Sequence, residues 1–147
     1  MRVPSYVLAI LTCLHFVAST QTVSAADKLL LDFGSGFRTS GVETRDVIIA
    51  KGQKSLRIMS RHNEDWPGIT LKAPAGKWDL SRHSMVQLDV ANRGGNKVTV
   101  CCRVDNPGAD GRKNCNTGSV TLEGGASATL TVEFTRKSEG AAGIKLW

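Results

Sequence analysis

Residues 85–105 read MVQLDVANRGGNKVTVCCRVD, and along them apolar side chains alternate with polar ones. Every second residue is aliphatic before a polar, glycine-rich segment at residues 92–97, and the same period returns after it. A period of two indicates strands with one face buried and the other in water. The aliphatic positions predicted for the core are Val86, Leu88, Val90, Val98, Val100 and Val104.

Similar short runs continue on both sides of this stretch, at a spacing of about ten residues that is typical of β-sandwiches. No apolar period of 3.6 persists for three helical turns, which excludes a helical domain. Leu130, Val132 and Phe134 join the predicted core. The predicted strands cover residues 28–33, 46–50, 55–60, 68–72, 85–92, 97–105, 119–123, 128–135 and 143–147. The sequence therefore predicts an all-β, antiparallel, two-sheet sandwich.

The connections between the middle strands carry turn residues. Arg93-Gly94-Gly95-Asn96 and Gly124-Gly125 tolerate a positive φ, which favours tight hairpins between consecutive, antiparallel strands. Residues 105–118 are expected to form one long loop.

The first 25 residues have the pattern of an export signal. Arg2 gives the positive start, residues 6–18 form the apolar run, and Val23-Ser24-Ala25 is a small-residue cleavage site. The run is shorter than the roughly 20 residues that span a bilayer. We expect a secreted, extracellular or periplasmic protein with no membrane contact after cleavage, whose mature domain is residues 26–147.

Charge is spread evenly along the mature chain. Without Arg2, 18 of the 19 Lys and Arg residues remain against 13 acids, which gives +5, and acids interleave with the basic residues. No basic block is present, so a nucleic-acid partner is not expected.

Three cysteines remain after signal cleavage: Cys101, Cys102 and Cys115. An oxidising compartment favours one disulfide, and adjacent residues of a strand face opposite sides. We expect Cys115 to bond to either Cys101 or Cys102. No Cys-x-x-Cys pair supports a zinc site.

Two tryptophans are candidates for contact with sugar rings, since aromatic rings stack on their apolar faces. Trp78 is expected to close the end of the core, beside a turn capped by Asp79 or Ser81. Trp66 follows a polar segment and is the expected aromatic anchor, although a structural role stays open. The water-facing positions Gln87, Asp89, Thr99 and Arg103 offer polar contacts if their strands are neighbours, and they are equally compatible with solvated surface.

Oxygen-bearing side chains gather in residues 105–111, where Asp105, Asn106 and Asp110 surround a proline and two glycines. Such a loop suits a structural calcium ion or a turn in which these side chains bond their own backbone. No cofactor is expected to be required, and the structural calcium ion stays open as an alternative to the turn.

Catalytic patterns are not found in the sequence. A glycosidase needs two carboxyls held a fixed distance apart in a cleft. Nothing in the sequence pairs the acids that fall at turns or strand ends, which are Glu43, Glu64, Asp65, Asp79, Glu123 and Glu139. No nucleophile elbow, zinc-protease motif or phosphate loop is present. An enzyme is therefore not expected.

Five segments of the chain form an ordered set of motifs: Asp32-Phe33, Trp66-Pro67, Trp78-Asp79-Leu80-Ser81, Leu88-Asp89-Val90-Ala91-Asn92 and Arg103-Val104-Asp105-Asn106-Pro107-Gly108-Ala109-Asp110-Gly111. This set resembles the N-terminal sandwich domain of bacterial β-agarases and β-galactosidase-like glycoside hydrolases. The resemblance implies a galactose-binding-like jelly roll, similar to carbohydrate-binding modules, which precedes a catalytic barrel in full enzymes. Any catalytic part would lie beyond Trp147.

These observations lead to an expected function and two alternatives. The expected function is a secreted, non-catalytic module that binds a galactan or agar-type polysaccharide and is normally attached to a glycoside hydrolase domain. The alternatives are an N-terminal fragment of a β-agarase-like enzyme and a structural spacer. Only residues 143–147 remain to pair beside the first strand, so we expect a jelly roll that is incomplete at its C-terminus.

Overall fold

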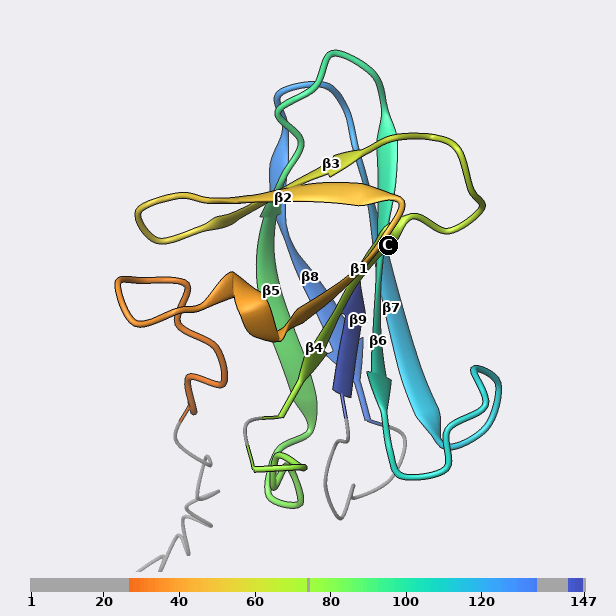
Figure 1. Ribbon diagram of the computed structural model, residues 1–147. Helices are drawn as coiled ribbons and strands as arrows, with labels where there is room; N and C mark the ends of the chain where they lie inside the picture. The colour runs from red at the N-terminus through yellow and green to blue at the C-terminus, as the bar shows by residue number, and fades with distance from the viewer. Residues whose placement is uncertain (1–26, 74, 135–142, 147) are drawn as a thin grey trace, which may run out of the picture.

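The computed structural model describes residues 27–73, 75–134 and 143–146, so the predicted signal peptide lies outside the described residues. Within these ranges the chain forms strands, one 3₁₀ turn at Thr39–Gly41 and no α-helix (Figure 1). All strand pairs are antiparallel. The all-β, antiparallel fold class is thus confirmed and is consistent with a β-sandwich.

The strands are β1 (Val42–Arg45), β2 (Val47–Lys51), β3 (Leu56–Ser60), β4 (Gly68–Lys72), β5 (Met85–Ala91), β6 (Val98–Asp105), β7 (Cys115–Leu122), β8 (Ser127–Glu133) and β9 (Gly143–Leu146).

One sheet has five strands in the order β1-β4-β9-β6-β7. The last strand of the chain, β9, lies at its centre, with Leu146 opposite Ile69 on one side and Cys102 on the other. The predicted strand at residues 143–147 therefore exists as Gly143–Leu146. It does not pair beside residues 28–33, which form no strand in the structure.

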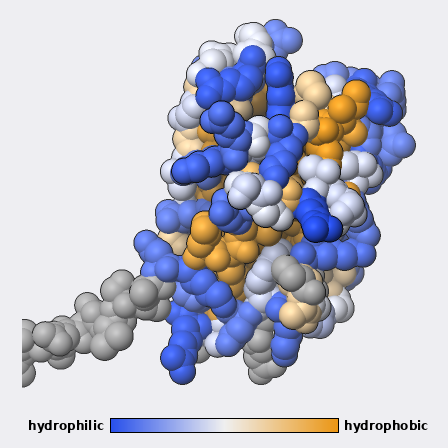
Figure 2. All heavy atoms as spheres, turned by 60° about the vertical axis from the view of Figure 1, so that its left-hand side comes forward, coloured by the Kyte–Doolittle hydropathy of each residue, from blue (hydrophilic) through white to orange (hydrophobic). Residues whose placement is uncertain are grey.

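Two smaller sheets, β5-β8 and β2-β3, accompany the five-stranded sheet. The β2-β3 hairpin runs crosswise to the long strands in Figure 1. Its Ile48 and Met59 lie directly opposite each other and are 46% and 37% exposed. In the space-filling view of Figure 2, further hydrophobic side chains are visible on the surface among hydrophilic ones.

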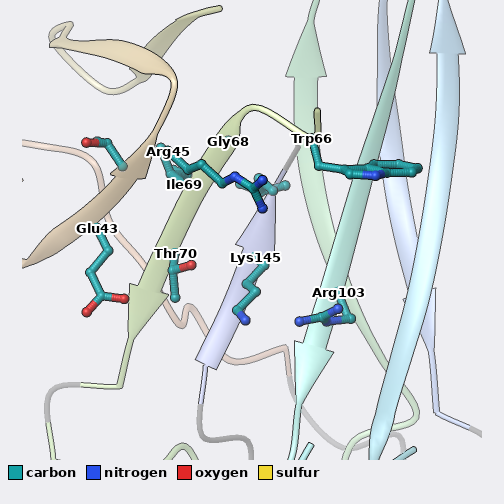
Figure 3. A pocket seen from close by; sticks show the side chains of 10 residues that line it. Glu43, Arg45, Trp66, Gly68, Ile69, Thr70, Arg103 and Lys145 are labelled. Carbon is teal, nitrogen blue, oxygen red and sulfur yellow. The ribbon is translucent and has the colours of Figure 1, made fainter. Parts of the chain in front are cut away.

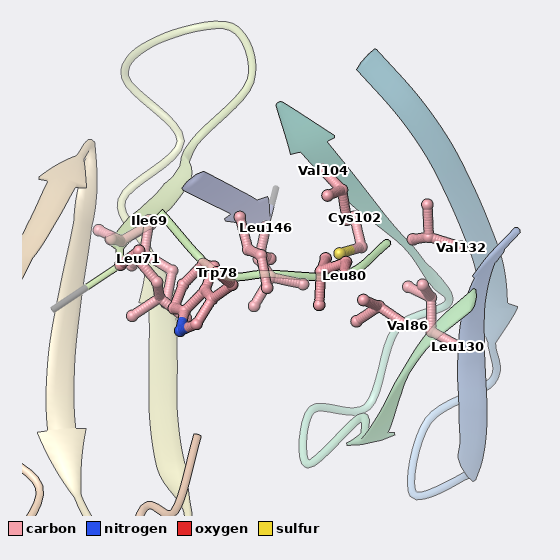
Figure 4. Close-up of a cluster of buried hydrophobic side chains, with 13 residues drawn as sticks. Ile69, Leu71, Trp78, Leu80, Val86, Cys102, Val104, Leu130, Val132 and Leu146 are labelled. Carbon is pink, nitrogen blue, oxygen red and sulfur yellow. The ribbon is translucent and has the colours of Figure 1, made fainter. Parts of the chain in front are cut away.

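The core lies between the inner face of the five-stranded sheet and the β5-β8 sheet (Figure 4). Trp78 and Leu80, which follow β4, lie in this cluster with little exposure, so the expected core position of Trp78 is confirmed. Asp79 Oδ1 accepts hydrogen bonds from the Ser81 amide and hydroxyl, as expected for the turn. The buried side chains that the two sheets contribute to this cluster are Ile69, Leu71, Cys102, Val104, Ile144, Leu146, Val86, Leu130 and Val132.

The prediction of hairpins at the glycine-rich turns is wrong. Strand β5 pairs with β8 and β6 pairs with β7 and β9, so both turns carry the chain from one sheet to another. The two turns pack against each other, because a Cβ on Gly124 would lie 2.5 Å from the Gly95 carbonyl oxygen. The glycines therefore allow two crossing connections to touch rather than two hairpins to close.

Asn92 holds these two connections together from a buried position. Its Nδ2 donates to the carbonyl oxygens of Asn96 at 2.7 Å, Glu123 at 3.1 Å and Leu122 at 3.3 Å. Its Oδ1 accepts from the Gly94 amide at 2.9 Å. Its backbone exchanges further bonds with the second turn, since its amide donates to Ala126 and its carbonyl accepts from Gly125. One side chain thus joins β5 to the ends of β6 and β7.

Gly118 of β7 faces the core where β7 approaches β8. A Cβ at this position would overlap the carbonyl group of Thr131 in β8. The close contact of these two strands, which belong to different sheets, therefore requires glycine.

Three segments differ from the prediction by more than two residues at a strand end. The β6-β7 pairing extends from Val98 opposite Leu122 to Asp105 opposite Cys115, so the expected long loop shortens to residues 106–114. Strand β1 was not predicted, because its sequence VETR lacks aliphatic alternation. Residues 28–33 instead pack beside the core through Leu30, Leu31 and Phe33 without joining a sheet.

The predicted core residues are largely confirmed. Val86, Val104, Leu130 and Val132 are buried, and Leu88, Val90, Val100 and Phe134 are partly buried against them. Val98 is 38% exposed, so its prediction is wrong. It is the first residue of β6, next to the crossing turn.

The predicted disulfide is also wrong, since all three described cysteines are free. The register places Cys115 opposite Asp105, three residues from Cys102 and four from Cys101 along β6. At about 3.4 Å per residue, this separates Cys115 from either partner by about 10 Å or more. A disulfide requires Cα atoms within about 7 Å.

Replacing Asn92 by Asp should unfold the protein at lower denaturant concentration. A carboxylate cannot donate to the carbonyl oxygens of Asn96, Leu122 and Glu123, so we expect a loss of about 3 kcal/mol in the free energy of unfolding. Asn96→Asp is the matched control, since its side chain is exposed in the same turn. Equal urea midpoints for the two variants would show that Asn92 does not join the sheets.

Cys102 should resist alkylation in the folded protein. Burial raises the pKa of its thiol to about 12, with a further contribution from Cys101. Because the thiolate is the nucleophile, iodoacetamide at pH 8 should label the half-buried Cys101 and Cys115 more than a hundredfold faster. All three should react in guanidinium chloride. Mass spectrometry that finds Cys102 labelled at the rate of the others would contradict this placement.

Candidate functional site

An open groove of about 530 Å³ lies over the outer face of the five-stranded sheet (Figure 3). Its floor comes from β1, β4, β9 and β6, and the β3–β4 loop contributes one end. The residues that line it are Glu43, Thr44, Arg45, Trp66, Gly68, Ile69, Thr70, Arg103, Lys145 and Leu146. Its volume falls within the range of about 300 to 1,000 Å³ that is common for ligand sites.

A single row of polar side chains crosses all five strands of this face. The register pairs Glu43 with Thr70, Thr70 with Lys145, Lys145 with Arg103, and Arg103 with Thr117. Residues that lie directly opposite each other share a face, so this row projects away from the apolar core. Insertion of β9 between β4 and β6 is what places Lys145 beside Arg103.

Asp105 holds the two cations of this row. Arg103 donates from Nε to Asp105 Oδ1 at 2.7 Å and from Nη2 to Oδ2 at 3.1 Å. Lys145 Nζ lies 3.4 Å from the same Oδ2. The Arg103 and Asp105 side chains are only 17% and 12% exposed, whereas that of Lys145 is 37% exposed. Arg103 therefore has a fixed position, and Lys145 faces the solvent of the groove.

Trp66 stands at the end of the groove opposite Glu43 in Figure 3. Its residue exposure is 66%, the second highest among the large exposed hydrophobic residues after Leu29. Its φ of 58° is positive, which is strained for a bulky residue and marks a conformation that the surrounding loop must hold. An exposed indole on a held backbone is suited to contact with a flat apolar ligand surface.

The loop that carries Trp66 is held by Asp46, which lies between β1 and β2. The Asp46 carboxylate accepts bonds from the amides of Asn63 at 2.6 Å and Glu64 at 2.9 Å, and from Asn63 Nδ2 at 3.0 Å. Its carbonyl oxygen accepts from the Arg61 amide. Desolvation acts to raise the pKa of Asp46, but the hydrogen bonds from Glu64 and Asn63 together outweigh it and lower the pKa below 3.8.

Two ion pairs flank the groove. Arg45 Nε contacts Glu64 Oε2 at 3.1 Å, which joins β1 to the loop of Trp66. Lys72 Nζ contacts Glu43 Oε1 at 2.5 Å on the other side. Both pairs are well exposed, so each contributes little to stability and serves mainly to orient side chains.

The structure separates the predicted contact residues into two groups. Trp66 and Arg103 line the same groove. Gln87 and Asp89 lie on the exposed face of β5, in a different sheet from β6, so the expected neighbourhood of these strands does not occur. Asp89 accepts a bond from Thr129 Oγ1 at 2.8 Å within that sheet. The four residues therefore do not form one site.

Several residues that line the groove were not predicted as contact residues, chiefly Lys145, Thr70, Glu43 and Arg45. Thr70 and Lys145 stand between buried neighbours in their strands, so alternation marks them as water-facing. The sequence contains no signal that β1, β4, β9 and β6 are neighbours, and their polar faces could not be combined without that order.

The candidate calcium residues have other partners. The Asp105 carboxylate bonds Arg103, and Asp110 Oδ1 accepts from the amides of Arg112 at 2.8 Å and Lys113 at 2.6 Å. Those bonds, first Lys113 and then Arg112, lower the pKa of Asp110 against an opposing effect of desolvation. Asn106 donates its backbone amide to Asn114 as part of the turn. Among the described residues no three His, Cys, Asp or Glu side chains form a metal-binding group.

Comparison of the chain with protein-family models, with curated proteins and with solved structures gives no significant match. None of the helices in the described part of the chain has the length and apolar character to cross a membrane.

Protonation of Asp46 should loosen the Trp66 loop in acid. Because the pKa of Asp46 is lowered in the folded state, its contribution to stability is complete above about pH 4 and disappears as the pH falls through the folded value. The Asn63 and Glu64 amide resonances should titrate together, with a midpoint below 3.8, the ordinary value for this group.

Asp46→Asn should abolish this titration, and Asp65→Asn in the same loop should preserve it. A midpoint at or above the ordinary value of Asp would contradict the role of Asp46 in holding the loop.

Proposed function

We propose that this chain is a secreted, non-catalytic carbohydrate-binding module of galactose-binding-like jelly-roll type, which binds a galactan or agar-type polysaccharide. The observation that carries the proposal is the exposed indole of Trp66 at one end of an open, polar groove. Sugar rings present apolar C–H faces to aromatic rings and hydroxyl groups to polar side chains. The groove offers both kinds of surface.

The polar partners for sugar hydroxyls come from the cross-strand row. Thr70 supplies a hydroxyl, Glu43 a carboxylate acceptor, and Lys145 an ammonium donor, all from neighbouring strands. In the free protein these groups are exposed to water, and Glu43 and Lys145 also form ion pairs. Each contact with a sugar hydroxyl therefore replaces an existing interaction and adds little net affinity. We expect a dissociation constant between about 1 μM and 1 mM.

The absence of catalysis is part of the proposal and follows from the groove's acids. Among the described residues that line it, Glu43 is the one carboxylate, whereas glycoside hydrolysis requires a pair flanking the bond. No cofactor is required. Attachment to a glycoside hydrolase domain, or origin as the N-terminal part of a β-agarase-like enzyme, rests on the sequence resemblance and the predicted export signal.

A structural spacer that packs on a partner domain is the second candidate. The observation that favours it is the cross-strand pair Ile48 and Met59, which presents large apolar side chains on the β2-β3 hairpin. Such pairs occur at protein contacts, although single exposed apolar residues are common on any surface.

Replacement of Trp66 by Ala should weaken retention in native affinity gels that contain agarose or another galactan by about tenfold, because it removes the stacking surface. Trp66→Phe should retain part of the binding. The matched control is Met59→Ala, which removes an exposed apolar side chain outside the groove and should bind as the parent does.

Unretarded migration of the parent in every galactan gel would refute the binding function and leave the spacer. Equal retention of the parent and Trp66→Ala would place any sugar contact outside this groove. Circular dichroism of each variant checks that the sheet structure is preserved.

A further inference from the structure

Two cations stand side by side on the floor of the groove. Lys145 and Arg103 are directly opposite each other in the β9-β6 pairing, an arrangement that like charges normally disfavour. They share one carboxylate, and both Lys145 Nζ and Arg103 Nη2 approach the same oxygen, Asp105 Oδ2, at 3.4 Å and 3.1 Å. These three side chains together carry two positive charges and one negative charge.

The ammonium group of Lys145 has N–H donors that its contact with Asp105 does not use. An ammonium carries three N–H donors, and within the described part of the chain the 3.4 Å contact with Asp105 is its one ion pair. Its side chain is 37% exposed toward the groove, so solvent meets the remaining donors. An anion that entered the groove would relieve the repulsion between Lys145 and Arg103.

The two other charged side chains that line the groove, Arg45 and Glu43, each form an ion pair with an oppositely charged neighbour. Arg45 is paired with Glu64, and Glu43 is paired with Lys72. The attraction for an anion is therefore centred on Lys145, in the same groove as the indole of Trp66 and beside the Thr70 hydroxyl.

We infer that the groove prefers a galactan bearing an anionic substituent, either a sulfate ester or a carboxylate, which Lys145 binds from the groove floor while Trp66 stacks on a sugar ring. This inference rests on the proposed carbohydrate-binding function and specifies its ligand class. Arg103 and Asp105 are positioning residues, because their mutual bonds fix the cation row beneath the ligand.

Binding should be measured by affinity electrophoresis on four polymers. Agarose is the neutral galactan, κ-carrageenan the sulfated galactan, polygalacturonate the carboxylated polymer of galactose configuration, and dextran sulfate a polyanion of different sugar. At about 0.1 M salt one or both anionic galactose polymers should bind more tightly than agarose and dextran sulfate, and at about 1 M salt the preference should disappear. Preference for only one of the two identifies sulfate or carboxylate as the substituent.

Lys145→Gln should weaken binding to the preferred anionic polymer by about fivefold, as expected for an exposed charge pair. It should weaken agarose binding less, because a neutral hydroxyl contact only replaces a hydrogen bond with water. The matched control is Lys97→Gln, which removes an equal charge from an exposed pair with Glu123 near the crossing turns and should change binding less than twofold. The two variants have the same net charge, so general attraction to polyanions affects both equally.

Equal effects of the two substitutions, binding of dextran sulfate as tight as that of the galactose polymers, or no difference between charged polymers and agarose would overturn the inference. In each of these cases, loss of agarose retention in Trp66→Ala would leave the carbohydrate-binding function standing. Failure of the parent to bind any polymer would overturn both.

Discussion

The buried side chain of Asn92 is the constraint on which the arrangement of the two layers depends. Two of the connections between the five-stranded sheet and the β5-β8 sheet lie at residues 92–97 and 123–126, and the carboxamide of Asn92 bonds to both of them. A carboxamide can donate and accept at once, which lets one group satisfy three carbonyl oxygens and one amide. With these crossings joined, the apolar faces of β5 and β8 lie over those of β6 and β9, and the core closes between them.

The groove is a consequence of how that core is closed. Strand β9 contributes Ile144 and Leu146 to the buried face, and this fixes the intervening Lys145 on the opposite face between Thr70 and Arg103. The Trp66 loop is fixed separately, through the carboxylate of Asp46. Both parts of the proposed sugar site are therefore held before a ligand arrives, which lowers the entropy lost on binding.

Sequence patterning predicted most strands because alternation depends only on neighbouring residues. The strand at residues 68–72 was located to the residue, and those around 85–92 and 97–105 to within one residue. Prediction failed where a segment lacks alternation, as in Val42–Arg45, or where apolar residues pack without joining a sheet, as at residues 28–33. The glycine turns were misassigned because glycine permits both a tight hairpin and the close contact of two crossing connections.

The sequence by itself determined the all-β class, the inward and outward faces of the long strands, and the choice of Trp66 and Arg103 as candidate contacts. The order of strands in space required the tertiary structure, since antiparallel partners are selected by the packing of faces far apart in the chain. That order joined Trp66, Lys145 and Arg103 in one groove and left Gln87 and Asp89 in another sheet. It also separated Cys115 from Cys101 and Cys102, because strand register, which depends on the whole sheet, sets which side chains meet.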